Sequence, residues 1–340
     1  MLAILDQLPD GFLGASPATL HEVLPSPTLI ELPGQREDWL FVSALLHGNE
    51  NTGLKAVQNV LRAWHGHPLP RGLAVFVGNP AAARLGVRHL PGQPDYNRVW
   101  PGAPESGSPE QAMVRAVVER MRGRRLFASV DIHNSTGLNP HYACVTRLGH
   151  DFLHLAALFS RTVVHYTRPL GVQTAAFSAL CPTVTIECGK AGKAASEKHA
   201  SDFLDACLRL RRFPARDIEP RELDLYHSVA TVTVAPDTRF SFDGDEADLM
   251  FVPDLDHMNF RERPPGTPWA SVGEQGLACL RVTDERGREV REEFFELRDR
   301  RLVTRRAAIP ALLTRDAHVI RQDCLCYLME RLALRPDAGR

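Results

Sequence analysis

Along the first two thirds of the chain, short apolar runs alternate with segments of helical periodicity. Four of the apolar runs have the length of buried strands: 39–46, 73–78, 127–133 and 182–187. Three segments repeat apolar residues at helical spacing: 52–64, 110–123 and 203–210. This alternation is typical of an α/β fold, so we predict a largely parallel sheet flanked by helices.

The pattern changes after about residue 215, where four short segments have the alternation of strands: 226–236, 240–244, 277–287 and 289–297. Turn residues separate these segments at short intervals, which favours a smaller β-domain. A charged, proline-containing stretch at 213–223 has the composition of a domain boundary. We therefore predict an α/β domain at 1–215 and a C-terminal β-rich domain at 216–340.

Charge and hydropathy exclude several classes of function. The chain has 40 Lys and Arg residues against 41 Asp and Glu residues, so no overall field attracts nucleic acid or an anionic membrane. No run approaches the ~20 apolar residues that span a bilayer, and the N-terminus lacks the basic region of a signal peptide. We expect a cytoplasmic protein that acts on a small molecule. The sequence leaves the oligomeric state open.

Cysteine usage agrees with a reducing compartment. The seven cysteines are odd in number and lie mostly within apolar stretches. We therefore interpret them as reduced core residues.

The first candidate chemistry follows the strand at 39–46. His47 and Glu50 lie in the loop that leads into the next helix, at the carboxyl end of the strand, where open α/β sheets place their ligand sites. Imidazole nitrogen and carboxylate oxygen are both good zinc ligands. Taken alone the spacing is weak, because a chain with 14 histidines contains about one such pair by chance.

A second histidine strengthens the metal hypothesis. His133 ends the strand at 127–133, so two histidines and one glutamate form the ligand set of a catalytic zinc site with an open position. Asp131 precedes His133 by two residues and points to the same side of the strand. It either orients the imidazole of His133 or has a structural role as a buried carboxylate or helix cap.

Glu187 ends a third predicted strand. A carboxylate there is costly to bury unpaired, whereas one that faces the metal site can act as a general acid and base. A structural salt bridge of Glu187 with Lys190 or Lys193 is the alternative.

The segment 88–102 reads as a loop that contains Arg88, Asn97 and Arg98. Guanidinium groups bind carboxylates through two hydrogen bonds and can stabilise an oxyanion. Standing alone, the segment is equally typical of an ordinary charged loop.

Five motifs occur in a specific order: HGNE at 47–50, GNP at 78–80, D-x-NR at 95–98, DIHN at 131–134 and TIECG at 185–189. Together they resemble the succinylglutamate desuccinylase/aspartoacylase family, which is related to the zinc carboxypeptidases. The resemblance implies a mixed sheet with flanking helices and deacylation of N-acyl amino acids. It also implies one zinc ion per chain, with three ligands: His47, Glu50 and His133.

The same resemblance implies roles for four further residues. Glu187 matches the acid/base, Arg88 the arginine that stabilises the oxyanion, and Asn97 with Arg98 the pair that binds the substrate's α-carboxylate. The stretch at 171–181 lacks an arginine that aspartoacylases carry for the substrate's side-chain carboxylate. The sequence therefore argues against N-acetylaspartate and leaves the acyl group and the amino acid open.

Two other functions are compatible with the motifs. A metallocarboxypeptidase would share the metal and the mechanism but act on the C-terminus of a peptide. A catalytically silent protein that binds a metal or ligand would keep the scaffold alone, although the presence of all three ligands and Glu187 argues against it.

Overall fold

The computed structural model describes residues 1–244 and 246–334, which form two compact units. Unit 1 comprises Met1–Asn134, His141–Leu225 and the described residues from Ala333 onward, and unit 2 comprises Ser135–Pro140 and Tyr226–Leu332. The domain limits expected from the sequence, 1–215 and 216–340, stay a proposal for the organisation of the chain.

Unit 1 is built on a mixed sheet with the strand order β1-β2-β4-β3-β5-β8-β6-β7. The central strands β3, β4, β5 and β8 are parallel to one another, whereas β2 is antiparallel to β4 and β6 to β8. This confirms the predicted mixed, largely parallel sheet. The strands are β1 (Ala3–Leu5), β2 (Thr28–Leu32), β3 (Gly34–Ala44), β4 (Leu69–Val77), β5 (Leu126–His133), β6 (Tyr142–Val145), β7 (Thr162–His165) and β8 (Thr183–Glu187).

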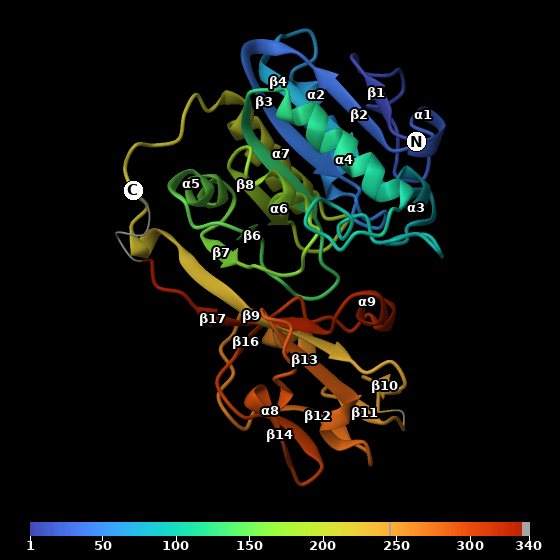
Figure 1. The fold of residues 1–340 in the computed structure, drawn as a ribbon, viewed down its shortest axis with the longest axis vertical. Coiled ribbons are helices and arrows are strands. Elements are labelled where there is room, and N and C mark those ends of the chain that lie inside the picture. Colours follow the sequence, from blue (N-terminus) through green and yellow to red (C-terminus); the bar gives the residue numbers. More distant parts are fainter. Residues whose placement is uncertain (245, 335–340) are drawn as a thin grey trace. The chain divides into compact units, whose positions relative to one another are not determined.

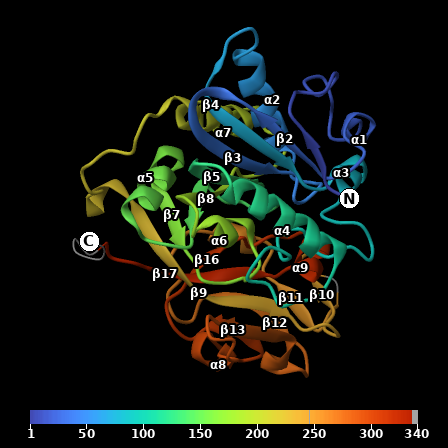
Figure 2. The ribbon, with the colours of Figure 1, turned by 45° about the horizontal axis from the view of Figure 1, so that its top comes forward.

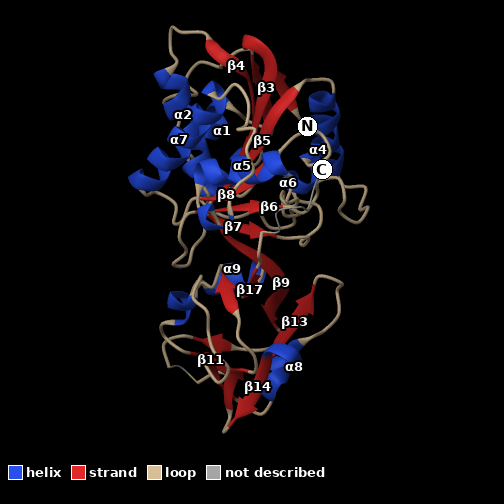
Figure 3. Cartoon of the chain, turned by 90° about the vertical axis from the view of Figure 1, so that its left-hand side faces the viewer, coloured by secondary structure: helices blue, strands red, loops and turns tan. Residues whose placement is uncertain are grey.

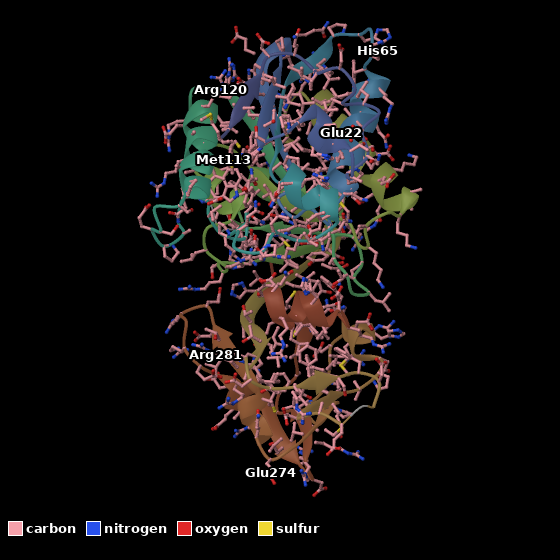
Figure 4. All side chains as sticks on the ribbon, turned by 90° about the vertical axis from the view of Figure 1, so that its right-hand side faces the viewer. Glu22, His65, Met113, Arg120, Glu274 and Arg281 are labelled. Carbon is pink, nitrogen blue, oxygen red and sulfur yellow. The ribbon has the colours of Figure 1, made fainter. Side chains whose placement is uncertain are left out.

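Helices cover both faces of this sheet, with α2 and α7 on one side of β3 and β4 and α4 on the other (Figures 1 and 3). Figure 4 labels Met113 and Arg120 on α4. Met113 belongs to the buried core, and Arg120 forms an ion pair with the buried carboxylate of Glu31 on β2. The helices are α1 (Leu20–Val23), α2 (Thr52–Ala63), α3 (Pro80–Leu85), α4 (Pro109–Arg122), α5 (His150–Phe159), α6 (Gln173–Phe177) and α7 (Ala194–Arg209), followed by the 3-10 turn η1 (Pro220–Glu222).

Unit 2 contains two groups of strands around a core that includes Trp269, which is fully buried. In the first group β9 pairs in antiparallel fashion with β13 and β17, and β16 pairs with β17. The second is a sheet of order β10-β11-β12-β15-β14, and α8 packs against β13 (Figure 2). The strands are β9 (Asp224–Val234), β10 (Phe240–Ser241), β11 (Leu249–Phe251), β12 (Pro268–Val272), β13 (Leu280–Asp284), β14 (Phe295–Arg298), β15 (Arg301–Thr304), β16 (Ile309–Ala311) and β17 (Cys326–Arg331). Its helices and 3-10 turns are η2 (Leu255–Met258), η3 (Gly276–Cys279), α8 (Arg291–Phe294) and α9 (Ala317–Gln322).

Three predicted segments need correction. The strand expected at 289–297 begins with α8, because Val290 and Phe294 are buried four residues apart at helical spacing, and only then continues as β14. The strand expected at 277–287 begins with η3 and is reduced to β13. The helix expected at 203–210 begins at Ala194, since its first turns are polar and bury only small side chains.

Two expectations about chemistry and hydropathy can be compared with the structure. All seven cysteines are free thiols and six of them are buried, in agreement with their interpretation as core residues. In the described ranges, no helix is long and apolar enough to cross a membrane.

Candidate active site

The parallel strands β3, β5 and β8 bring the predicted site residues to one edge of the sheet. His47 lies three residues beyond the end of β3, and His133 and Glu187 are the last residues of β5 and β8. His133 and Glu187 are direct partners in the register of these two strands, so their side chains lie on the same face. The carboxyl ends of three strands separated in sequence therefore meet at this site.

A sharp turn after β3 directs His47 into the site. Leu45 has a φ of 54°, a left-handed conformation that is unfavourable for a branched side chain and is maintained here by complete burial. At Gly48 an added Cβ would lie 2.2 Å from the carbonyl carbon of Ala82. The glycine of the HGNE motif is thus required because the loop passes directly over the backbone of α3.

His47, Glu50 and His133 form a buried cluster. One potential ligand atom from each residue lies within 4.8 Å of the other two. The Nδ1 atom of His47 is 2.9 Å from Glu50 Oε1, and Nδ1 of His133 is 2.7 Å from Glu50 Oε2. Three side chains that the sequence places on two different strand ends are therefore brought together.

Each histidine of the cluster also contacts a second carboxylate through its Nε2 atom. Nε2 of His47 lies 2.9 Å from Asp95 Oδ1, and Nε2 of His133 lies 2.8 Å from Asp131 Oδ2. A carboxylate at Nε2 favours the tautomer with its proton there, which leaves the lone pair of Nδ1 free for a metal. The orienting role considered for Asp131 agrees with this geometry.

The sequence pattern does not predict the role that Asp95 has in the structure. Its contact with His47 joins residues 48 positions apart, and the Asp of the D-x-NR motif was the only signal. Asp95 Oδ2 also accepts two hydrogen bonds from Arg88, at 3.0 Å from Nε and 2.8 Å from Nη2. One carboxylate therefore orients both a candidate ligand and the candidate oxyanion arginine.

The donor set fits a divalent cation such as zinc. Two imidazoles and one carboxylate are the ligands of catalytic zinc sites, and both Nδ1 atoms face the carboxylate of Glu50. Burial favours the neutral acid, yet the neighbouring His47 and His133 hold the pKa of Glu50 below its ordinary value. Glu50 is therefore ionised, as a metal ligand must be.

Glu187 faces this cluster without a partner of its own. Its Oε2 atom is buried and accepts no hydrogen bond, and within the described ranges Glu187 forms no ion pair with Lys190 or Lys193. Burial raises the pKa of Glu187 to about 7, whereas the nearby His133 acts in the opposite direction. A carboxylate poised near neutral pH has the property required of a general acid and base.

The loop after α3 contributes the remaining candidates. Nη1 of Arg88 lies 3.8 Å from Glu50 Oε1, so Arg88 reaches the edge of the cluster. The Asn97 amide nitrogen lies 3.2 Å from Asp131 Oδ2 and 3.0 Å from His133 Nε2. Arg98 donates to the carbonyl of Asn97 at 2.9 Å. The predicted residues thus come from four separate segments and meet at one place, although their roles stay predictions.

The fold and the site together define an α/β protein with a candidate metal centre, a buried His/Glu/His cluster at the carboxyl ends of its strands. Among such proteins, the succinylglutamate desuccinylase/aspartoacylase catalytic domain matches residues 37–213, just over half of the chain. The chain belongs to this family, which confirms the resemblance deduced from the five motifs.

Curated relatives match only over a short region. A succinylglutamate desuccinylase of Pseudomonas syringae pv. tomato is 34% identical over 84 residues, which is 24% of this chain and 24% of the relative. One of Pseudomonas paraeruginosa is 33% identical over 104 residues, 28% of this chain and 31% of the relative. The matched region therefore spans about a quarter to a third of these relatives.

Solved structures extend the likeness of the fold over nearly the whole chain. A succinylglutamate desuccinylase of Chromobacterium violaceum has a TM-score of 0.61 at 19% identity, over 94% of this chain and 99% of that one. Murine aminoacylase 3 has a TM-score of 0.59 at 15% identity, over 88% and 97% of the two chains. At such low identity, these similarities support the fold.

Proposed function

We propose that this protein is a zinc-dependent amidohydrolase that removes the acyl group from an N-acyl amino acid. The observation that carries the proposal is the cluster of His47, Glu50 and His133, together with the partly buried carboxylate of Glu187, whose Oε2 atom is buried without a hydrogen-bond partner. Family membership supports it, since the matched relatives are named succinylglutamate desuccinylases.

One zinc ion per chain would be held by His47, Glu50 and His133, through Nδ1 of each histidine. When bound, zinc supplies a Lewis acid for the substrate carbonyl and lowers the pKa of water. Asp95 and Asp131 hold the two imidazoles in the tautomer that can bind it.

Glu187 carries the proton during the reaction. In its ionised form it takes a proton from the attacking water, whose oxygen forms a bond with the amide carbon. It then gives this proton to the amide nitrogen as the carbon–nitrogen bond breaks, which releases the free amino acid and the carboxylic acid of the acyl group. A pKa near neutrality suits both halves of this cycle.

Arg88 and Arg98 each stabilise a different negative charge on the substrate. Arg88 stabilises the oxygen of the tetrahedral intermediate, and Asp95 fixes its guanidinium in advance. Arg98 and Asn97 bind the α-carboxylate of the amino acid.

A hydrolysis screen of the zinc-loaded protein tests the function. The panel contains N-acyl amino acids that vary in acyl group and side chain, together with dipeptides and longer peptides, and release of free amine is measured. The expected result is turnover of acyl amino acids, and this turnover should fall by ~10²–10⁴-fold in Glu187→Gln. Preferred cleavage of long peptides would assign a metallocarboxypeptidase, and a metal-loaded protein without turnover would be a silent binder.

A further inference from the structure

The Asn97 side chain makes a contact that its proposed role does not explain. Its Oδ1 atom accepts a hydrogen bond at 3.0 Å from the backbone N–H of Gln173, which lies 76 residues later and is the first residue of α6. Val172, the N-cap residue of α6, makes no capping bond with its own side chain. Asn97 therefore caps α6 from a distant loop, by satisfying one of the N–H groups that a helix leaves open at its start.

This bond determines which end of the Asn97 amide faces the candidate metal centre. Because Oδ1 is turned toward α6, the nitrogen end faces Asp131 Oδ2 at 3.2 Å. A flipped amide would place its oxygen against the carboxylate of Asp131, which also accepts from Ser43 at 2.6 Å and from His133 at 2.8 Å. The N–H of Gln173 thus selects one of two amide orientations.

In the selected orientation the Asn97 amide nitrogen lies 3.2 Å from Asp131 Oδ2 and 3.0 Å from His133 Nε2, so its second N–H is left for a substrate when Nε2 of His133 carries a proton. The amide nitrogen has two hydrogens, and one is directed at Asp131. In the metal-binding tautomer, Nε2 of His133 carries a proton that it donates to Asp131, so it cannot accept the second hydrogen of Asn97.

Gln173 is itself held firmly. It is fully buried, and its side-chain amide donates to Ser129 Oγ on β5 at 2.5 Å. The neighbouring Gly171 has a φ of 71°, and an added Cβ there would lie 2.7 Å from the carbonyl oxygen of Arg98. The N–H of Trp100 donates to the Gly171 carbonyl at 3.0 Å, so the two segments are joined at several points.

We propose that Gln173 is a positioning residue for substrate recognition: its backbone N–H holds the Asn97 amide so that one Asn97 N–H can bind the substrate's carboxylate. The inference rests on the proposed deacylase function and adds a residue that contacts neither the metal ligands nor the substrate. Preorganisation of this kind lowers the cost of ordering the Asn97 amide when substrate binds.

A pair of variants separates the N–H of Gln173 from its side chain. Gln173→Pro removes the donor, and proline suits the first helical position, since Val172 already has the extended backbone (φ −96°, ψ 151°) that precedes proline. Gln173→Ala keeps the N–H but loses the bond with Ser129, and is the matched reference. In the zinc-loaded protein, we expect KM of Gln173→Pro to exceed that of Gln173→Ala by about 3- to 10-fold, with kcat within about twofold.

The same pair in an Asn97→Ala background tests the route of the effect. Without the Asn97 amide, the difference in KM between the proline and alanine variants should disappear. Equal KM values in the parent background, or a difference that persists in Asn97→Ala, would overturn the inference while leaving the deacylase function intact.

Amide hydrogen exchange gives a test that depends on neither turnover nor the proline variant. Asn97→Ala should accelerate exchange at the Gln173 amide by roughly tenfold or more, relative to the Ala176 amide within the same helix, which bonds to Val172. If the parent protein hydrolyses no acyl amino acid, the proposed function fails and this measurement alone decides the positioning contact. Unchanged exchange at Gln173 would refute it.

Discussion

Replacing Glu187 with glutamine should make the protein a poorer enzyme and, at alkaline pH, a more stable one. The substitution keeps the size of a side chain whose Oε2 atom is buried without a partner, and it removes the charge. As the base is lost, kcat should fall by ~10²–10⁴-fold. Zinc content should stay the same, because Glu187 is not among the proposed ligands.

The effect on stability follows from the raised pKa of Glu187. Folding raises this pKa from 4.5 to about 7, so the folded protein favours the neutral acid. The resulting cost to stability is absent below about pH 4.5, develops as pH rises, and is fully present above about pH 7. A shift of this size corresponds to at most ~3 kcal/mol, and less to the extent that solvent reaches the carboxyl group. Glutamine does not ionise, so the Glu187→Gln variant does not lose stability in this way as pH rises.

Denaturant unfolding of metal-free protein measures this difference, since a bound cation would stabilise the carboxylate. At pH 8.5 the free energy of unfolding of Glu187→Gln should exceed that of the parent by about 1–3 kcal/mol, and the two should converge near pH 4.5. Glu119→Gln, at an exposed position on α4, is the control and should change neither stability nor turnover. Turnover within a few-fold of the parent would make Glu187 structural. Equal stability at pH 8.5 would refute the burial argument.

Further variants test the other parts of the site. His133→Ala should lose the metal, because two remaining ligands do not form a stable site, and full zinc occupancy by elemental analysis would exclude His133 as a ligand. Asp95→Asn should weaken zinc affinity by roughly 10- to 100-fold in a chelator competition, and unaltered affinity would show that its bond with His47 is dispensable. Arg98→Ala should raise KM, with a loss of about one to two orders of magnitude in kcat/KM that Arg98→Lys restores only in part. Arg88→Ala should instead lower kcat. If steady-state kinetics show a lowered kcat for Arg98→Ala and a raised KM for Arg88→Ala, the proposed roles of the two arginines are reversed.

Much of the fold was predictable because the sheet of unit 1 has regular patterns. Long apolar runs without alternation identify β3, β4, β5 and β8 as strands buried on both faces, and the helices between them repeat at their own period. Shorter elements could not be predicted in this way. The four residues of α8 form a single turn that depends on the burial of Val290 and Phe294, and α7, whose first turns are polar, packs against α2.

The sequence alone determined which candidate site residues are present and where along the chain they lie. It placed His47, Glu50, His133 and Glu187 at strand ends, because the carboxyl edge of a parallel sheet follows directly from strand order and direction. The ordered motifs carried that information because neighbouring residues encode the local backbone. An example is Gly48, where the loop passes over the backbone of α3.

Only the tertiary structure decided the pKa, the tautomer and the orientation of those groups. The bond of Asp95 with His47 spans 48 residues and that of Gln173 with Asn97 spans 76, and neither has a periodicity or spacing that local sequence could reveal. The raised pKa of Glu187 has the same origin, because desolvation depends on everything that surrounds the carboxylate. Residue type fixes what a side chain can do, whereas its pKa, tautomer and orientation depend on partners that only folding brings within hydrogen-bond distance.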